Sequence, residues 1–119
     1  ESGVSTKLLR FPGGSSNTVS RICEGIMGRI ANELVDRGYR YFDWNVDSND
    51  AGGATSSSQV ASNVIAGIKK KSVSNVLMHD IKGYTVDAID QIVSWGLANG
   101  YQFKAMTPSS PMFCFRTNN

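Results

Sequence analysis

The sequence has few of the residues that mark several common classes of protein. Its 119 residues include one histidine and two cysteines, and charged residues make up only 18%. No apolar stretch approaches the roughly 20 residues of a membrane-spanning helix. A net charge of +2 without an extended basic patch gives no electrostatic case for nucleic-acid binding. We therefore expect neither a membrane span nor a nucleic-acid partner.

Cysteine usage and the chain start leave alternatives open. Cys23 and Cys114 match no metal or redox spacing, and they could form a disulfide or remain two buried thiols. No signal peptide is evident. Because the first residue is Glu1, we expect a processed product or a piece of a longer protein.

Short apolar segments alternate with helical periodicity along the chain. Strands are expected at residues 7–11, 39–46, 75–79 and 101–106. The first helix is expected to take its N-cap from residues 15–17 and to end at Gly38. Ser57 or Ser58 is expected to cap the second helix, and Asn99-Gly100 to end the third. The expected buried positions are Val19, Ile22, Ile26, Ile30 and Leu34; Val60, Val64, Ile65 and Ile68; and Val86, Ile89, Ile92, Val93 and Leu97.

This βαβαβαβ order predicts an α/β fold of parallel strands joined by right-handed crossovers. Four strands and three helices amount to about half of a (β/α) barrel of ~250 residues. Residues 107–119, with Pro108 and Pro111, are expected to form an irregular tail. The unclosed sheet edges would need cover from a partner half or from a second copy of the chain.

Polar side chains follow three of the expected strands, and loops after parallel strands lie at the same end of the fold. The three loops span residues 10–14, 43–50 and 77–80, and they contain Arg10, several carboxylates and the only histidine, His79. A carboxylate beside a histidine orients the imidazole and favours its charged form, which suits a general acid. An arginine beside a second carboxylate keeps that group ionised as a base.

Each of these residues has an alternative structural interpretation. His79 could be a core histidine bonded to a backbone group, and Arg10 could form an ordinary surface ion pair. Asp47 and Asp50 could be loop-forming residues that bond their own backbone. Their grouping at one end of the fold favours a functional site.

In this order the three loops resemble the last three of five motifs in the polysaccharide deacetylase family, carbohydrate esterase family four, also called the NodB-homology domain. The run from Leu9 to Gly14 resembles its third motif, an arginine followed by a proline-glycine turn. The run from Trp44 to Asp50 resembles the fourth, and Leu77-Met78-His79 matches the fifth, leucine-x-histidine. The fourth motif usually ends in Asp-Trp, whereas Ala51 follows Asp50 here, which leaves the substrate preference open.

The resemblance implies hydrolysis of N-acetyl groups on N-acetylglucosamine polymers, either peptidoglycan or chitin-like, with a divalent metal, usually zinc, as cofactor. It implies that His79 is the general acid, that Asp50 pairs with it, and that Arg10 orients the catalytic base. Asp47 is the second choice for the partner of His79. The residues expected to bind substrate are Leu77, Trp44, Asp47 and Pro12. A bacterial extracellular or cell-wall location is also implied.

The family's first two motifs, an Asp-Asp pair and His-x-x-x-His, are missing from this chain. A zinc site of the family's kind needs three protein ligands, two of them histidines. Nothing evident would fix Asp43, Asp47, Asp50 and His79 as a substitute site. We therefore expect residues 1–106 to be the C-terminal half of a deacetylase domain that binds no metal and is inactive alone. The missing N-terminal half or a second copy of the chain would be its partner.

The alternative is a non-catalytic module that binds carbohydrate or assembles with other chains. Its stacking surfaces would be aromatic side chains: Trp44, Tyr41, Tyr84 and Trp95. Glycan binding by the chain alone, unchanged by loss of Arg10 or His79, would favour this alternative.

Overall fold

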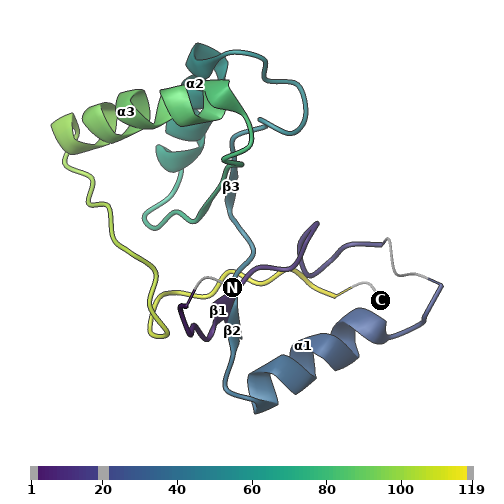
Figure 1. The fold of residues 1–119 in the computed structure, drawn as a ribbon. Coiled ribbons are helices and arrows are strands. Elements are labelled where there is room, and N and C mark those ends of the chain that lie inside the picture. The colour runs from purple at the N-terminus through teal and green to yellow at the C-terminus, as the bar shows by residue number, and fades with distance from the viewer. Residues whose placement is uncertain (1–2, 19–21, 118–119) are drawn as a thin grey trace. The chain divides into compact units, whose positions relative to one another are not determined.

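The structure, a computed structural model, describes residues 3–18 and 22–117 (Figure 1). These residues form an α/β fold with parallel strands. The chain divides into two compact units. Unit 1 comprises Glu1–Asp43 and Met106–Asn119, and unit 2 is the continuous segment Trp44–Ala105.

The described residues of unit 1 form a two-stranded parallel sheet and one helix. Strand β1 (Leu8–Leu9) pairs with β2 (Arg40–Tyr41), and α1 (Ile26–Asp36) connects them as a crossover. The C-terminal segment extends this unit, because the Asp43 N–H donates to the Phe113 carbonyl at 2.7 Å. Residues 107–117 contain no helix or strand.

Unit 2 repeats the same arrangement with a larger core. Strand β3 (Val46–Asp47) pairs in parallel with β4 (Val76–Leu77), α2 (Ser57–Ile68) connects them, and α3 (Gly83–Ala98) follows. Helices α2 and α3 pack side by side (Figure 1). The core of unit 2 lies around them and consists of Ala54, Val60, Ala61, Val64, Ile68, Ala88 and Ile92.

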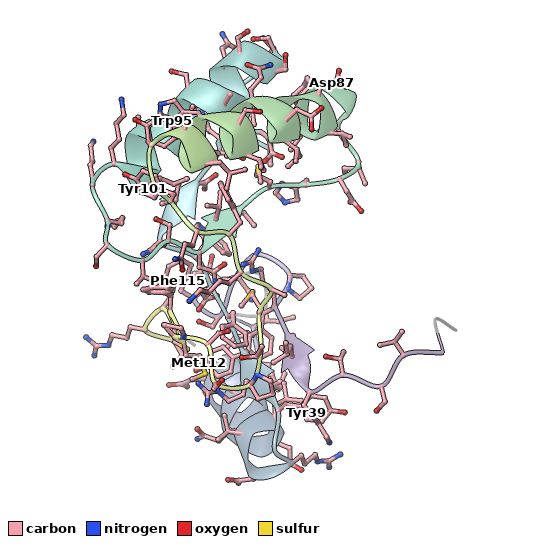
Figure 2. All side chains as sticks on the ribbon, turned by 90° about the vertical axis from the view of Figure 1, so that its left-hand side faces the viewer. Tyr39, Asp87, Trp95, Tyr101, Met112 and Phe115 are labelled. Carbon is pink, nitrogen blue, oxygen red and sulfur yellow. The ribbon has the colours of Figure 1, made fainter. Side chains whose placement is uncertain are left out.

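Two aromatic side chains cover the edge of this core. The rings of Trp95 and Tyr101 lie 5.2 Å apart and pack against the buried cluster (Figure 2). The Lys69 ammonium lies 5.3 Å from the Trp95 ring centroid. Trp95 is therefore a packing residue, and its contacts give no support to a carbohydrate-stacking surface at this position.

The expected strands are shorter in the structure, and one is missing. The expected strand at residues 39–46 is split into β2 and β3, because Asp43 leaves the β1 ladder and hydrogen-bonds the C-terminal segment instead. Only Val76–Leu77 of the expected strand at 75–79 forms a ladder, and both residues are half-buried rather than buried. The expected strand at 101–106 is wrong. No described strand pairs with it, and the Tyr101 N–H donates to Gly96 in α3.

The first helix begins later than expected. Its N-cap is Gly25 rather than one of residues 15–17, and the left-handed φ of 73° at Gly25 cannot continue into an α-helix. The buried face is also shifted, since Met27 and Ala31 are buried whereas Ile22 is 96% exposed and Ile30 is exposed. Val19 lies outside the described residues.

The other two helices form where expected, with different details. Ser56 rather than Ser57 or Ser58 is the N-cap of α2, and its hydroxyl accepts from the Gln59 N–H at 3.3 Å. On α3, three expected core residues are exposed: Val86, Ile89 and Leu97. The buried stripe is Thr85, Ala88, Ile92 and Gly96. Thr85 contacts Asp50, Ala88 and Ile92 belong to the core cluster, and Gly96 lies against Phe103.

No helix within residues 3–18 and 22–117 has both the length and the apolar character needed to cross a lipid bilayer.

Candidate active site

Unit 2 contains a buried carboxylate, Asp50, in the loop between β3 and α2. The loop is shaped by Asn49, whose φ of 57° is left-handed, and by two turn hydrogen bonds that its carbonyl accepts from Gly52 and Ala54. The Asp50 N–H also donates to the Ser48 hydroxyl at 3.3 Å. This local geometry turns the Asp50 side chain inward, where it is completely buried.

Asp50 contacts His79 twice, just beyond the end of β4. The His79 ring Nδ1 lies 2.8 Å from Asp50 Oδ1, and the His79 backbone N–H donates to Asp50 Oδ2 at 2.7 Å. The His79 side chain remains 38% exposed. One edge of the imidazole is therefore fixed by a buried carboxylate while part of the ring faces solvent.

The first turn of α3 supplies two further hydrogen bonds to Asp50. The Thr85 hydroxyl, which is buried, donates to Asp50 Oδ2 at 2.9 Å. The Tyr84 hydroxyl donates to the Asp50 carbonyl at 3.0 Å. Both the side chain and the main chain of Asp50 are thus bonded to a helix that packs in the core of unit 2.

These contacts keep Asp50 ionised. Burial by itself would raise the pKa of this carboxyl, but hydrogen bonds from the His79 ring and backbone, and then from Thr85 and Ser48, lower the pKa to about 2. An ionised carboxylate can only accept, so His79 Nδ1 must carry the proton in their hydrogen bond. The nitrogen left to exchange a proton with a substrate is Nε2.

The other expected site residues of unit 2 have different surroundings. Asp47 is exposed and accepts from the Asn49 N–H at 2.8 Å, which is the loop-forming bond considered as its alternative. The carboxylate that contacts His79 is that of Asp50. Leu77 and Trp44 are half-buried. Their proposed roles toward a substrate stay predictions.

Arg10 lies in unit 1, just after β1, and contacts the end of β2. Its Nε donates to the Phe42 carbonyl at 2.9 Å and its Nη2 to the Asp43 carbonyl at 3.3 Å. Burial lowers the pKa of Arg10, and the Asp43 charge opposes that shift. Pro12 is exposed in the turn that follows, which the Gly14 N–H closes by donating to Phe11.

Asp43 is a second fully buried carboxylate, and it joins segments of unit 1 that are distant in sequence. It accepts from the Ser15 N–H at 2.8 Å, from the Ser15 hydroxyl, and from the Phe115 N–H at 2.7 Å. The loop after β1, the end of β2 and the C-terminal segment meet at this side chain. Its donors give it a structural role.

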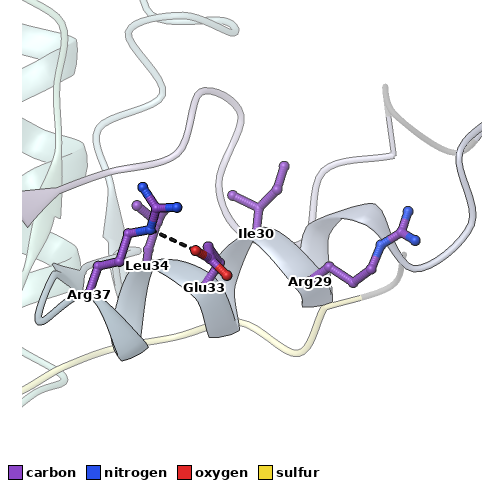
Figure 3. A pocket seen from close by; sticks show the side chains of 5 residues that line it. All are labelled: Arg29, Ile30, Glu33, Leu34 and Arg37. Atoms are coloured by element: carbon purple, nitrogen blue, oxygen red, sulfur yellow. Dashed lines mark hydrogen bonds and ion pairs between the residues drawn. The ribbon is translucent and has the colours of Figure 1, made fainter.

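Unit 1 also has a hollow along α1 (Figure 3). Glu33 and Arg37 form an exposed ion pair there, with Oε1 and Nε 2.6 Å apart. The hollow contains no histidine, cysteine or hydroxyl group, and it gives no support to a catalytic function. It is lined by Arg29, Ile30, Glu33, Leu34 and Arg37.

The part of the chain that the structure describes contains no group of three or more His, Cys, Asp or Glu side chains that could hold a metal ion. Cys23 and Cys114 are both free and exposed, so this structure shows neither of the two alternatives that the sequence left open, a disulfide or two buried thiols. The residues present therefore do not fit a zinc site with three protein ligands.

The sequence indicated no catalytic role for Tyr84 and Thr85, the two α3 residues whose hydroxyl groups hydrogen-bond Asp50. A polar residue within the buried stripe of an amphipathic helix was the available signal for Thr85, since a buried hydroxyl requires a partner. The apolar pattern placed Val86 first on the buried face of this helix, and Thr85 was therefore not predicted to be buried.

The chain is similar to several known proteins. No model of a protein family matches the chain. A peptidoglycan-N-acetylglucosamine deacetylase of Bacillus cereus is 32% identical over 108 residues, which cover 87% of this chain and 37% of that protein. The catalytic domain of a peptidoglycan N-acetylglucosamine deacetylase from Eubacterium rectale is 51% identical, with a TM-score of 0.94 over 98% of this chain and 54% of that one. The chain matches a C-terminal part of a polysaccharide deacetylase domain.

Two further solved structures agree in fold. A polysaccharide deacetylase from Bacillus cereus is 27% identical with a TM-score of 0.67 and covers 94% of this chain and 53% of that one. A carbohydrate esterase family four enzyme from Streptococcus mutans has a TM-score of 0.64 at 24% identity, covering 83% and 43%. The resemblance to polysaccharide deacetylases is thus confirmed, and the chain spans between about a third and about half of these relatives.

Proposed function

We propose that this chain is the C-terminal half of a barrel-like peptidoglycan N-acetylglucosamine deacetylase, in which His79 is the general acid. The supporting observation is the contact of His79 Nδ1 with the buried Asp50 carboxylate, in a chain that is 51% identical to such a catalytic domain. A location outside the bacterial cell, at the peptidoglycan, belongs to the same proposal.

Deacetylation requires a proton on the leaving nitrogen. Water adds its oxygen to the acetyl carbon, the carbon–nitrogen bond breaks, and the products are acetate and a free amine. The amide nitrogen is too poor a leaving group to depart as an anion, so a proton must reach it as the bond breaks. His79 Nε2 would supply that proton, and the Asp50 carboxylate would hold the imidazole in position for the transfer.

Arg10 would act on the catalytic base rather than on the general acid. Hydrogen bonds to the Phe42 and Asp43 carbonyls hold its guanidinium at the end of β2. In this position it would orient a base carboxylate contributed by the rest of the domain. We propose that Leu77, Trp44, Asp47 and Pro12 contact the sugar or its acetyl group.

The metal that the family implies does not fit the residues of this chain. We propose that its ligands lie in the rest of the domain, which would also cover the open edges of the two small sheets. On this proposal the chain alone binds no zinc stoichiometrically and releases no acetate.

The test is to reconstitute a complete domain. The chain is co-expressed with the segment of the Eubacterium rectale catalytic domain that it does not match, and acetate release from N-acetylglucosamine oligomers is measured. Acetate release is expected, and His79→Ala should lower it by about 10²–10⁴-fold, the usual contribution of a general acid. Asp87→Asn, at an exposed position on α3, is the matched control and should leave the rate unchanged.

Two results would contradict the proposal. One is an assembled complex that releases no acetate under conditions in which the intact Eubacterium rectale domain does. The other is release that persists undiminished in His79→Ala. In the second case the Asp87→Asn control counts as well: a rate that falls equally in His79→Ala and Asp87→Asn reflects general destabilisation and gives His79 no specific part in the reaction.

A further inference from the structure

We propose that Thr85 is a positioning residue for the candidate general acid: its hydroxyl fixes the Asp50 carboxylate so that Oδ1 faces His79 Nδ1. The inference rests on the proposed function for its catalytic meaning. Its physical content, the orientation of one carboxylate and the proton position on one imidazole, can be measured in this chain alone.

The two oxygens of Asp50 have different partners. Oδ2 accepts from both the His79 backbone N–H at 2.7 Å and the Thr85 hydroxyl at 2.9 Å, whereas Oδ1 accepts from the His79 ring at 2.8 Å. Rotation about the bond to a carboxylate has only a broad, two-fold preference of its own. Two donors on one oxygen, together with the hydrogen bond from Ser48, restrict that freedom and leave the other oxygen for the imidazole.

Thr85 is suited to this role because it belongs to a well-packed element. It is 2% exposed and lies in the first turn of α3, on the same stripe as Ala88 and Ile92, which pack against α2. The Thr85 N–H donates to the Lys82 carbonyl at 2.9 Å. The hydrogen bond from Thr85 therefore fixes the Asp50 loop relative to the core of unit 2, in addition to the turn hydrogen bonds within the loop.

The consequence is a fixed proton position on the ring. With the carboxylate held as an acceptor at Nδ1, neutral His79 is the Nδ1–H tautomer and leaves the lone pair on Nε2. Without the Thr85 hydroxyl, Asp50 can rotate away, and the neutral ring is free to place its proton on Nε2. In that tautomer the lone pair is on Nδ1, so Nε2 cannot take up the proton that it would later donate.

The experiment is nitrogen NMR on the full chain labelled at histidine, in which His79 gives the only imidazole signals. In the unsubstituted chain at high pH, the Nδ1–H form should make up nearly all of the neutral population. Thr85→Val keeps the shape and removes the hydroxyl, and it should reduce that form to a minority. Thr85→Ser retains a hydroxyl and should restore it.

Tyr84→Phe is the matched control. It removes the other hydrogen bond from α3 to Asp50, which goes to the main-chain carbonyl rather than to the carboxylate. The tautomer should therefore stay unchanged. Equal tautomer populations in Thr85→Val and the unsubstituted chain would overturn the inference, as would failure of Thr85→Ser to restore the Nδ1–H form.

A second measurement covers the case in which Thr85→Val does not fold. A buried hydroxyl bonded to a carboxylate exchanges slowly with water, so the Thr85 hydroxyl proton should give a resolved signal in the unsubstituted chain. A rapidly exchanging hydroxyl would overturn the inference. Because neither readout requires deacetylation, an inactive reconstituted domain would contradict the proposed function and leave this result standing.

Discussion

The two buried aspartates, Asp43 in unit 1 and Asp50 in unit 2, show how the same side chain can serve two purposes. Each is at most 2% exposed, and each accepts from a hydroxyl and from a backbone N–H. They differ in what else they contact. Asp43 bonds a second main-chain N–H, that of Phe115, whereas Asp50 bonds the ring of a partly exposed histidine.

A buried carboxylate needs donors to compensate for lost hydration, and the kind of donor decides what it does. Main-chain donors are fixed and do not titrate near neutrality, so Asp43 holds segments together. An imidazole can lose or gain a proton, so Asp50 can affect chemistry at the surface of unit 2. Substitutions at the two positions should therefore differ in kind as well as in size.

The largest effect is expected from Asp43→Ala. Removing this carboxylate takes the acceptor from two amide groups and leaves the Ser15 hydroxyl only the Phe115 carbonyl at 3.3 Å, and we expect a loss of about 3 kcal/mol in the stability of unit 1. Hydrogen exchange at Ser15 and Phe115 should accelerate strongly, while the Ser48 amide in unit 2 stays protected. Asp36→Ala on the exposed side of α1 is the control. Equal protection at Phe115 in both variants would refute the structural role.

Asp50 should give a stability contribution that depends on pH. Its pKa is about 2 in the folded chain against 3.8 for the unperturbed group, so the unfolded chain binds more protons at acidic pH. The contribution is present above about pH 4 and disappears as the pH falls toward 2, and it amounts to about 2 kcal/mol.

Urea unfolding between pH 5 and pH 2 measures this contribution. The stability of the unsubstituted chain should fall more steeply than that of Asp50→Asn, which cannot titrate at this position. Parallel curves for the two proteins would show that Asp50 is not held as a carboxylate by its donors.

The two hydroxyl groups allow a closely matched comparison. Ser15→Ala and Thr85→Val each remove one hydroxyl from a buried carboxylate, and each should cost about 1.5 kcal/mol. Only Thr85→Val should change the nitrogen signals of His79. A change of similar size in Ser15→Ala would mean that those signals report general loosening, and the distinction between the two aspartates would fail.

The smallest effect is expected in the loop before Asp50. Asn49 adopts a φ of 57°, which asparagine tolerates better than most residues, so Asn49→Ala should cost about 1 kcal/mol. Asn49→Gly should be close to neutral by the same measure, because glycine enters this region freely. Thermal unfolding of both variants checks the order, and a glycine variant less stable than the alanine variant would contradict it.

Sequence periodicity predicted the existence of all three helices, because apolar residues at helical spacing persist over several turns. It predicted the buried faces less well. On α3 the inward stripe contains Thr85, Ala88 and Gly96, and these small residues contribute little to a hydrophobic pattern. Tertiary contacts with Asp50, with α2 and with Phe103 selected these small residues, while larger apolar residues of α3 stayed exposed.

Strand prediction failed where hydrogen-bond partners decide the outcome. Residues 39–46 look like one strand by composition, yet the backbone changes partner at Asp43, and residues 101–106 have no described partner strand. Local composition cannot show which segment lies alongside. The contact of Asp50 with His79 joins loops that follow two paired strands, so the order of the strands made this contact predictable. The inward orientation of the Asp50 side chain depends on loop geometry at Asn49 that the sequence does not reveal.

The Asp43 carboxylate also affects the order in which the chain can fold. Unit 2 is one continuous segment, so its contacts can form as soon as residues 44–105 have left the ribosome. Unit 1 is discontinuous in sequence. The hydrogen bond from the Phe115 N–H to Asp43 can therefore form only after a further 72 residues have been synthesised. During synthesis, the segment that presents Arg10 is therefore completed after the segment that presents His79, and loop-closure entropy makes this late step the slower one.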